Sequence, residues 1–166
     1  NVQFTDTFDG DGDNLAMTWT AFSDNVAVTD HRIILYTNAA CSTGANDLGL
    51  TGSSSALDNG IVDSIADGTY YATVTAYDAA GNSTVSACST DSIIVDTTAP
   101  TDNTANIQFT DAYDTDGDNL AMTWTAFSDA VGVTDHRIIL YTNAACSTGA
   151  NDLGLTGSSS AVDNGI

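Results

Sequence analysis

The chain has 166 residues, of which 22 are acidic and only two are basic, so its formal charge is −20. Every acidic residue is an aspartate, and Glu and Lys, which are strong helix formers, are both absent. This composition argues against a helical protein. The negative surface also excludes nucleic-acid binding, because phosphate contacts need basic side chains. No apolar run approaches the roughly 18 residues of a membrane-spanning helix, so we expect no membrane insertion.

Short segments of alternating polarity, divided by turn residues, follow one another along the first hundred residues. The alternation places Leu15, Met17, Trp19 and Ala21 on one face of a strand. A second long alternation places Tyr70, Ala72, Val74 and Ala76 on one face. In chain order, the pattern predicts strands over 2–5, 15–22, 32–36, 61–65 and 69–77, and one strand or a strand pair over 84–95.

The Gly-, Ser- and Asn-rich segment 38–56 is expected to be a long connection between strands. With that connection, the pattern amounts to about seven short strands in about 96 residues, which is typical of an all-β sandwich. Residues 97–101 contain the only proline of the chain and are expected to form a linker.

An internal repeat determines the expected domain organisation. Residues 1–61 reappear as residues 106–166; seven of the 61 aligned positions differ and the other 54 are identical. We therefore expect a complete domain over 1–96, a linker over 97–101 and the N-terminal part of a second, near-identical domain over 102–166. An incomplete sandwich would expose an apolar sheet face and unpaired strand edges, which favours association. Either a longer array or a neighbouring chain would complete it.

Four segments carry a resemblance to known families. Residues 67–82 (DGTYYATVTAYDAAGN) resemble the F strand and following turn of bacterial immunoglobulin-like domains, and residues 95–101 (VDTTAPT) are similar to the linker between such domains. Residues 19–29 resemble the B strand and BC loop of fibronectin type III modules, and residues 11–15 resemble a turn of cadherin-like repeats. The resemblance implies tandem immunoglobulin-like sandwiches in an extracellular, cell-surface adhesin or fibre.

The acidic turn, Asp9-Gly10-Asp11-Gly12-Asp13, is the strongest local candidate for a metal site. Three carboxylates at alternate positions suit calcium, which takes six to eight oxygen ligands. The turn departs from an EF-hand loop because its sixth position is Asn14 and no helices flank it. A solvated turn without a ligand is the alternative.

In an immunoglobulin-like sandwich this turn would lie at the end from which the chain leaves the domain. The expected calcium ligands gather there with carboxylates of the E–F turn, of the linker and of the next copy. Bound Ca²⁺ would then hold consecutive domains in a stiff rod. The full set, with the repeated turn, is Asp9, Asp11, Asp13, Asp67, Asp96, Asp102, Asp114, Asp116 and Asp118.

Each full repeat contains two cysteines, and an extracellular setting favours a disulfide. Cys41 and Cys88 form the preferred pair, although a simple sandwich would place them at opposite ends. A bond from Cys41 to the Cys88 equivalent of the next copy, or a free thiol, is the alternative. Cys146 is the second copy of Cys41.

Several other side chains receive structural interpretations. We expect His31 to lie at the surface and to pair with Asp30, and its copy His136 to do the same. Asp24, together with Asp30, is expected to cap the BC loop, and calcium binding by this pair is the less favoured alternative. Trp19 is expected to lie in the core.

Two kinds of tyrosine are distinguished on the long strand over 69–77. Tyr70 is expected to form the tyrosine-corner hydrogen bond at the start of its strand. Tyr71 and Tyr77 fall on the opposite face and are expected to be the more exposed.

The leading hypothesis is a structural module of a long extracellular fibre or surface adhesin, stiffened by calcium. Its partners would be neighbouring repeats, identical chains in a fibre, or a cell-surface or glycan target. The alternatives are a filament subunit assembled by strand complementation between chains and a carbohydrate-binding accessory module of a secreted enzyme. An enzyme is the least favoured reading, because no recognisable motif surrounds His31 with a nucleophile and an orienting acid.

Overall fold

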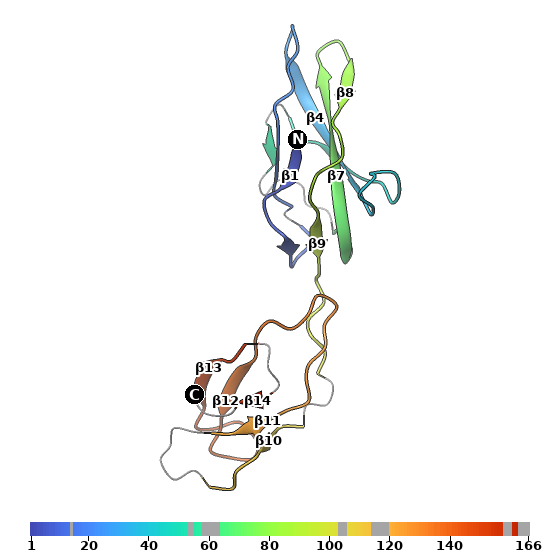
Figure 1. Ribbon diagram of the computed structural model, residues 1–166. Coiled ribbons are helices and arrows are strands. Elements are labelled where there is room, and N and C mark those ends of the chain that lie inside the picture. Colours follow the sequence, from blue (N-terminus) through green and yellow to red (C-terminus); the bar gives the residue numbers. More distant parts are fainter. Residues whose placement is uncertain are drawn as a thin grey trace. The chain divides into compact units, whose positions relative to one another are not determined.

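The computed structural model describes residues 1–13, 15–52, 55–57, 64–102, 106–113, 120–157 and 161–162. Within this part of the chain the protein is all-β (Figure 1). None of the described residues forms a helix that could cross a membrane. The chain forms two compact units, residues 1–98 and 99–166, and their boundary falls inside the expected linker 97–101.

The first unit contains two sheets. The smaller sheet is antiparallel and has the order β1 (Val2–Phe4), β3 (Met17–Trp19) and β6 (Ala56–Leu57). The larger sheet has the order β2 (Phe8–Asp9), β9 (Ile93–Val95), β7 (Gly68–Asp78), β4 (Val28–Tyr36) and β5 (Asn46–Leu50), and β8 (Ser83–Val85) also pairs with β7. The pairing of β2 with β9 is parallel, whereas all other strand pairs in this unit are antiparallel.

Both sheets contribute side chains to one core. Met17 comes from the small sheet, Ile33 and Leu35 come from β4, and Val74 comes from β7; all four are fully buried. The alternation predicted for β7 is confirmed, because Tyr70, Ala72, Val74 and Ala76 are all buried. The alternation predicted for residues 15–22 holds for Leu15, Met17 and Trp19 but is wrong for Ala21, which is exposed because β3 ends at Trp19.

The expected long connection over 38–56 instead contains β5 and begins β6. β5 pairs antiparallel with β4, and its register shifts between Ile33 and Ile34 because Leu48 is an extra, bulged residue. The bulge turns Leu48 into the core, where it is buried, and Gly49 after it takes a positive φ of 87°. The composition of this segment did not predict a strand, because its sequence NDLGL is rich in turn residues.

The predicted segment 84–95 is a strand pair, β8 and β9. Between them, side chains replace part of the backbone ladder: Ser86 Oγ accepts a hydrogen bond from Val74 N at 3.0 Å, and Ser89 Oγ accepts one from Ala72 N at 3.0 Å. Of the predicted strand 61–65, residues 61–63 lie outside the described part. Residues 64–65 are not in a strand, although Ile65 is buried.

The described part of the second unit repeats the β1–β3, β3–β6 and β4–β5 pairings of the first unit. One sheet has the order β10 (Gln108–Phe109), β11 (Met122–Thr123) and β14 (Ala161–Val162), and the other pairs β12 (Arg137–Leu140) with β13 (Asn151–Leu155). β12 has four residues where its near-identical copy β4 has nine. β4 is longer because β7 pairs with it along one edge. Among the described residues, no strand pairs with the corresponding edge of β12.

Candidate functional site

The linker end of the first unit is formed by β2, β9, the acidic turn and the segment before β7. Asp96 N donates to Asp9 O at 2.9 Å, and Ile65 N donates to Gly12 O at 3.2 Å. Gly12 has φ +73°, and a Cβ at this position would lie 2.6 Å from Ile65 O, so only glycine fits. These contacts bring the acidic turn and the start of the linker to one end of the sandwich.

Asp67 fixes the chain where it leaves this unit. Its Oδ1 accepts hydrogen bonds from Thr97 N at 2.8 Å and from Thr97 Oγ1 at 2.7 Å, and its Oδ2 accepts one from Thr98 Oγ1 at 2.6 Å. The Thr98 hydroxyl, followed by the two Thr97 donors, lowers the pKa of the Asp67 carboxyl below its ordinary value. One exposed carboxylate therefore ties three donors of the linker to the start of β7.

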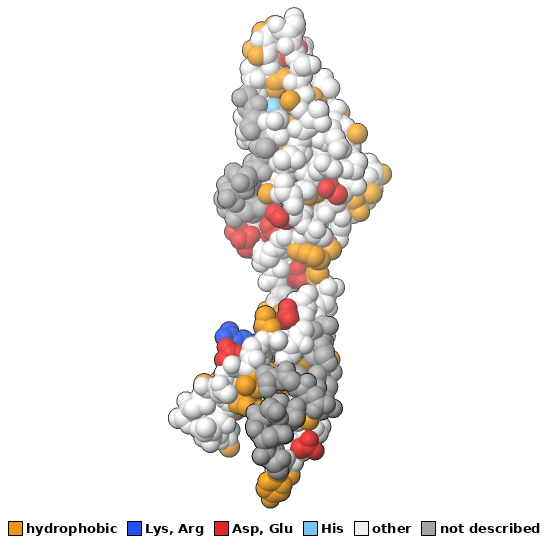
Figure 2. Space-filling view, turned by 60° about the vertical axis from the view of Figure 1, so that its left-hand side comes forward, with side chains coloured by type: hydrophobic (Ala, Val, Ile, Leu, Met, Phe, Trp, Pro, Cys, Tyr) orange, Lys and Arg blue, Asp and Glu red, His pale blue; other side chains and the backbone are white. Residues whose placement is uncertain are grey.

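The other carboxylates at this end accept hydrogen bonds from nearby backbone amides. Asp9 Oδ1 accepts from Asp11 N at 3.1 Å and from Gly12 N at 2.5 Å, and Asp11 Oδ1 accepts from Asp13 N at 3.1 Å. Asp96 Oδ1 accepts from the backbone N–H two residues later at 3.1 Å. Several acidic side chains are visible near this end of the first unit in Figure 2.

The structure thus places five of the expected calcium ligands, Asp9, Asp11, Asp13, Asp67 and Asp96, at the linker end of the first unit. Asp102 belongs to the second unit. Asp114, Asp116 and Asp118 lie outside the described residues. Among the residues that are described, no three His, Cys, Asp or Glu side chains are grouped as a metal site would need.

Cys41 and Cys88 form a disulfide, with their Cα atoms 5.7 Å apart. The preferred intradomain pairing is confirmed, and the two alternatives for Cys41 are wrong. Two features explain why Cys41 and Cys88 meet, although a simple sandwich would place them at opposite ends. The loop after β4 turns back on Asn38, whose Oδ1 accepts from Ser42 N and Thr43 N at 3.0 and 3.1 Å. Cys88 also lies midway between β8 and β9, not at the start of the last strand.

His31 is not a surface residue, so that prediction is wrong. Its side chain is 2% exposed and packs against Trp19 and Phe22, with ring centroids 5.3 and 5.7 Å away. Its Nδ1 lies 2.9 Å from Gly52 O; because a carbonyl oxygen only accepts, Nδ1 is the protonated donor. His136 repeats this arrangement with Trp124 and Phe127, although it is only half-buried.

The expected partner of His31, Asp30, has a different role. Asp30 Oδ1 accepts hydrogen bonds from the His31 backbone N–H at 3.0 Å and from Gly52 N at 2.7 Å, so it ties β4 to the chain after β5. Asp24 caps the BC loop through Val26 N at 2.8 Å, as expected, whereas the prediction that Asp30 shares in this cap is wrong.

The tyrosines of β7 lie on its two faces, as predicted. Tyr70 Oη donates to Ala66 O at 2.9 Å, which confirms the tyrosine corner. Tyr71 and Tyr77 are half-buried, and thus more exposed than Tyr70, as expected.

Sequence reasoning did not single out the ion pair of each repeat. Arg32 on β4 donates from Nε to Asp47 Oδ1 on β5 at 2.9 Å, and its Nη2 contacts Asp47 Oδ2. Arg137 and Asp152 repeat the pair. The Arg32 guanidinium, as the largest influence, lowers the pKa of the Asp47 carboxyl. Arg32 and Asp47 are 15 residues apart and lie on two different strands, so no local sequence pattern indicated the pair.

The second unit has an apolar groove of about 930 Å³ beside β12. Its lining includes Ile107, Phe109, Trp124, Ile138 and Cys146. Figure 2 shows hydrophobic side chains reaching the surface of this unit.

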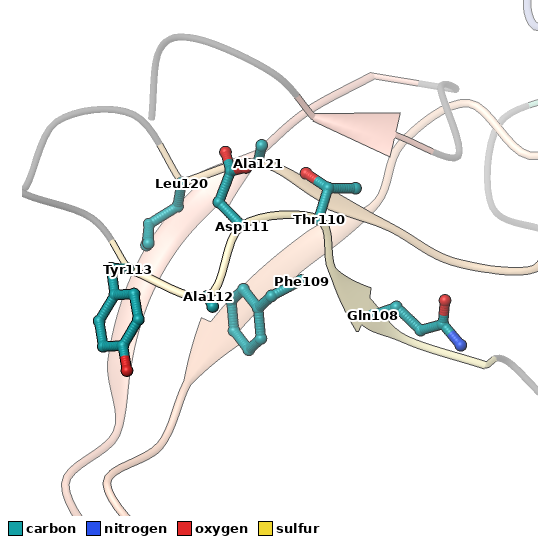
Figure 3. A pocket seen from close by; sticks show the side chains of 8 residues that line it. All are labelled: Gln108, Phe109, Thr110, Asp111, Ala112, Tyr113, Leu120 and Ala121. Atoms are coloured by element: carbon teal, nitrogen blue, oxygen red, sulfur yellow. The ribbon is translucent and has the colours of Figure 1, made fainter.

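A smaller hollow of about 690 Å³ lies next to β10 and β11. In Figure 3 the side chains of Phe109 and Tyr113 lie on one side of this segment, and Asp111 extends toward Leu120 and Ala121. Tyr113 is 90% exposed, whereas its copy in the first unit, Phe8, is 57% exposed. This hollow adds to the apolar surface that the second unit presents to solvent.

No protein-family model matches the chain, and no curated protein matches it.

Proposed function

We propose that the protein is a structural repeat module of a long extracellular fibre or cell-surface adhesin, built from immunoglobulin-like domains. Two features of the first unit support the immunoglobulin-like assignment. The strand orders β1-β3-β6 and β2-β9-β7-β4-β5 correspond to A-B-E and A′-G-F-C-C′, and Tyr70 forms the corner bond typical of such domains.

The observation that carries the proposal is the way the chain enters and leaves the first unit. β2 follows β1 near the start of the unit and β9 precedes the linker. The two strands pair in parallel through Ile94 N to Thr7 O and Asp96 N to Asp9 O, both at 2.9 Å. A force that pulls the two ends of the unit apart slides two parallel strands past each other. The hydrogen bonds then share the load and do not break one at a time. Asp67 holds the linker at the same place.

This geometry suits a module that transmits tension in an array. The disulfide adds a second resistance, because it closes a loop across 47 residues of the same unit. The Asp-only acidity keeps neighbouring modules soluble and separate in a saline medium.

Single-molecule force spectroscopy of the full chain tests the proposal. We expect the first unit to unfold in one step at a force that falls when Asp9→Pro removes the Asp9 N–H from the β2–β9 ladder. Asn25→Pro, in the exposed BC loop away from this ladder, is the matched control for the effect of proline itself, because the Asp24 cap takes its donors from Val26 and Ala27 and not from Asn25. Equal unfolding forces for the unsubstituted chain and Asp9→Pro would remove the mechanical argument.

Calcium binding at the linker end is a separable part of the proposal. The backbone of the acidic turn meets the backbone of Asp96 at this end, where Asp67 also binds the linker, and carboxylate oxygens are the ligands that calcium prefers. Calcium titration followed by isothermal calorimetry and small-angle scattering tests it, with Asp11→Asn plus Asp13→Asn as the variant and Asp24→Asn as the control. No heat of binding and an unchanged scattering profile after chelation would remove calcium from the account and leave the mechanical role in place.

A further inference from the structure

The disulfide of the first unit lies, in sequence, between the two strands over which tension would act. Cys41 follows β4 and Cys88 precedes β9, and their bond closes a loop with a sequence separation of 47 residues. The strands β5, β6, β7 and β8 begin and end inside this loop. A pull on the two ends of the unit therefore passes through the S–S bond and bypasses the residues that the bond encloses.

The enclosed residues include a hairpin whose own contacts lie inside the loop. β7 and β8 pair antiparallel, with Thr75 opposite Val85. Asp78 closes the turn between them: its Oδ1 accepts hydrogen bonds from Ala80 N at 2.9 Å and Asn82 N at 2.8 Å, and its Oδ2 accepts one from Asn82 Nδ2 at 2.7 Å. Tension that bypasses the loop does not load these bonds, so the hairpin is shielded while the rest of the unit extends.

The folded unit also restricts access to the disulfide. The chain on either side of Cys88 is bound to β7: Ser86 N donates to Val74 O and Ser89 N donates to Ala72 O, both at 2.8 Å. The hydroxyl oxygens of the two serines accept hydrogen bonds from the backbone N–H groups of the same two β7 residues. Both cysteines of the bond are half-buried. Because thiol–disulfide exchange depends on access to the sulfur atoms, these contacts slow it.

We infer that the disulfide makes the first unit a two-stage extensible element with a redox-controlled stop. When the β2–β9 pairing breaks, the residues before Cys41 and after Cys88 extend, and the S–S bond stops further extension. A small thiol that reaches the newly exposed bond releases the second stage. This inference rests on the proposed mechanical role and adds to it a control by the redox state of the surroundings.

The two stages have predictable lengths. The first unit spans residues 1–98, and the loop accounts for 47 of these positions, which leaves 51 outside it. At about 3.5 Å for each extended residue, the first stage frees about 180 Å of chain and the second about 160 Å. A unit without the bond should release both lengths in one step.

Release of the second stage is a thiol–disulfide exchange. The thiolate of a small thiol such as glutathione attacks one of the two cysteine sulfurs. A mixed disulfide forms between that cysteine and the small thiol as the Cys41–Cys88 bond breaks, and the other cysteine leaves as a thiolate. Tension then separates the two cysteines, so the leaving thiolate does not return. The step uses one thiol for each unit that opens and needs no other reductant.

Force-clamp measurements on the full chain test the inference. A Cys146→Ser background removes the exposed thiol of the second unit and so prevents disulfide exchange with it. Without a small thiol, we expect the first unit to extend by the first stage alone. With glutathione present, a second step of about 160 Å should follow the first and never precede it. Cys88→Ser, the matched control, should release both stages as one long step with or without glutathione.

A bulk measurement without tension tests the restricted access by itself. Glutathione should reduce the disulfide of the folded unit at least about tenfold more slowly than that of the unit unfolded in urea, because exchange depends on access. Alkylation of the released thiols measures both rates. If Cys88→Ser does not fold, the unsubstituted chain, reduced before the force measurement, gives the same comparison of step lengths.

Three results would overturn the inference. Equal step lengths with and without the bond would show that tension does not bypass the loop. Absence of a second step in glutathione would show that the stop is not released under load. Equal reduction rates in the folded and the urea-unfolded chain would show that the fold does not restrict access. The force at which the first step occurs tests the mechanical role separately, because a weak β2–β9 pairing lowers that force and leaves the step lengths unchanged.

Discussion

Removing one hydroxyl, in Tyr70→Phe, tests whether the tyrosine corner holds the start of β7 in the first unit. Tyr70 is 8% exposed, and its hydroxyl donates to Ala66 O at 2.9 Å. The substitution keeps the buried ring but leaves a partly buried carbonyl without its donor, which costs about 1.5 kcal/mol. For a unit of 98 residues, this corresponds to a fall of about 6–12 °C in melting temperature.

The measurement needs a signal from the first unit alone. Fluorescence of Trp19, which lies in that core, provides it in a background where Trp124→Phe silences the second unit. Tyr71→Phe, on the opposite face of β7, is the matched control and should change the melting temperature by less than about 2 °C. If Tyr70→Phe and Tyr71→Phe melt together, the corner bond does not stabilise the fold and the reasoning is wrong.

The remaining predictions concern backbone strain, acid and the disulfide. Ala27 has φ 142° where the second copy has glycine, so Ala27→Gly should raise the free energy of unfolding by about 1 kcal/mol in urea titrations; a loss of stability would contradict the strain argument. Hydrogen bonds lower the folded-state pKa values of Asp67 and Asp78, so their stabilisation is complete above the unfolded pKa of about 3.9 and is lost as pH falls below it. In Asp78→Ala the melting temperature should fall less between about pH 5 and about pH 3 than it does in the unsubstituted chain, and an unchanged acid profile would exclude this group. Reducing the Cys41–Cys88 disulfide should lower the free energy of unfolding by about 4 kcal/mol, measured with and without reductant, and equal stability in both would show that the loop closure is unimportant.

Local patterns predicted the features that depend on neighbours in sequence. The alternation of Tyr70 to Ala76 predicted β7 because a strand places every second residue on one face. Asp24 was expected to cap its loop because its carboxylate reaches backbone amides two residues away. These contacts span only a few residues, so they can be predicted from the local sequence.

The features that were missed depend on partners distant in sequence. The sequence of β5 indicates a loop, because this turn-rich segment forms a strand only by pairing with β4 through the bulge at Leu48. The polarity of His31 predicts a surface position, but its burial depends on contacts with Trp19, Phe22 and the Gly52 carbonyl. Such partners come together only when the sheets pack.

The sequence by itself determined the repeat, the all-β class, the acidity and the alternating faces. Only the tertiary structure decided which residues distant in the sequence meet. Arg32 pairs with Asp47, Asp67 accepts hydrogen bonds from Thr97, and His31 packs against Trp19. The physical reason is that these contacts form only when strands and loops far apart in the chain pack together, so no local sequence pattern specifies them.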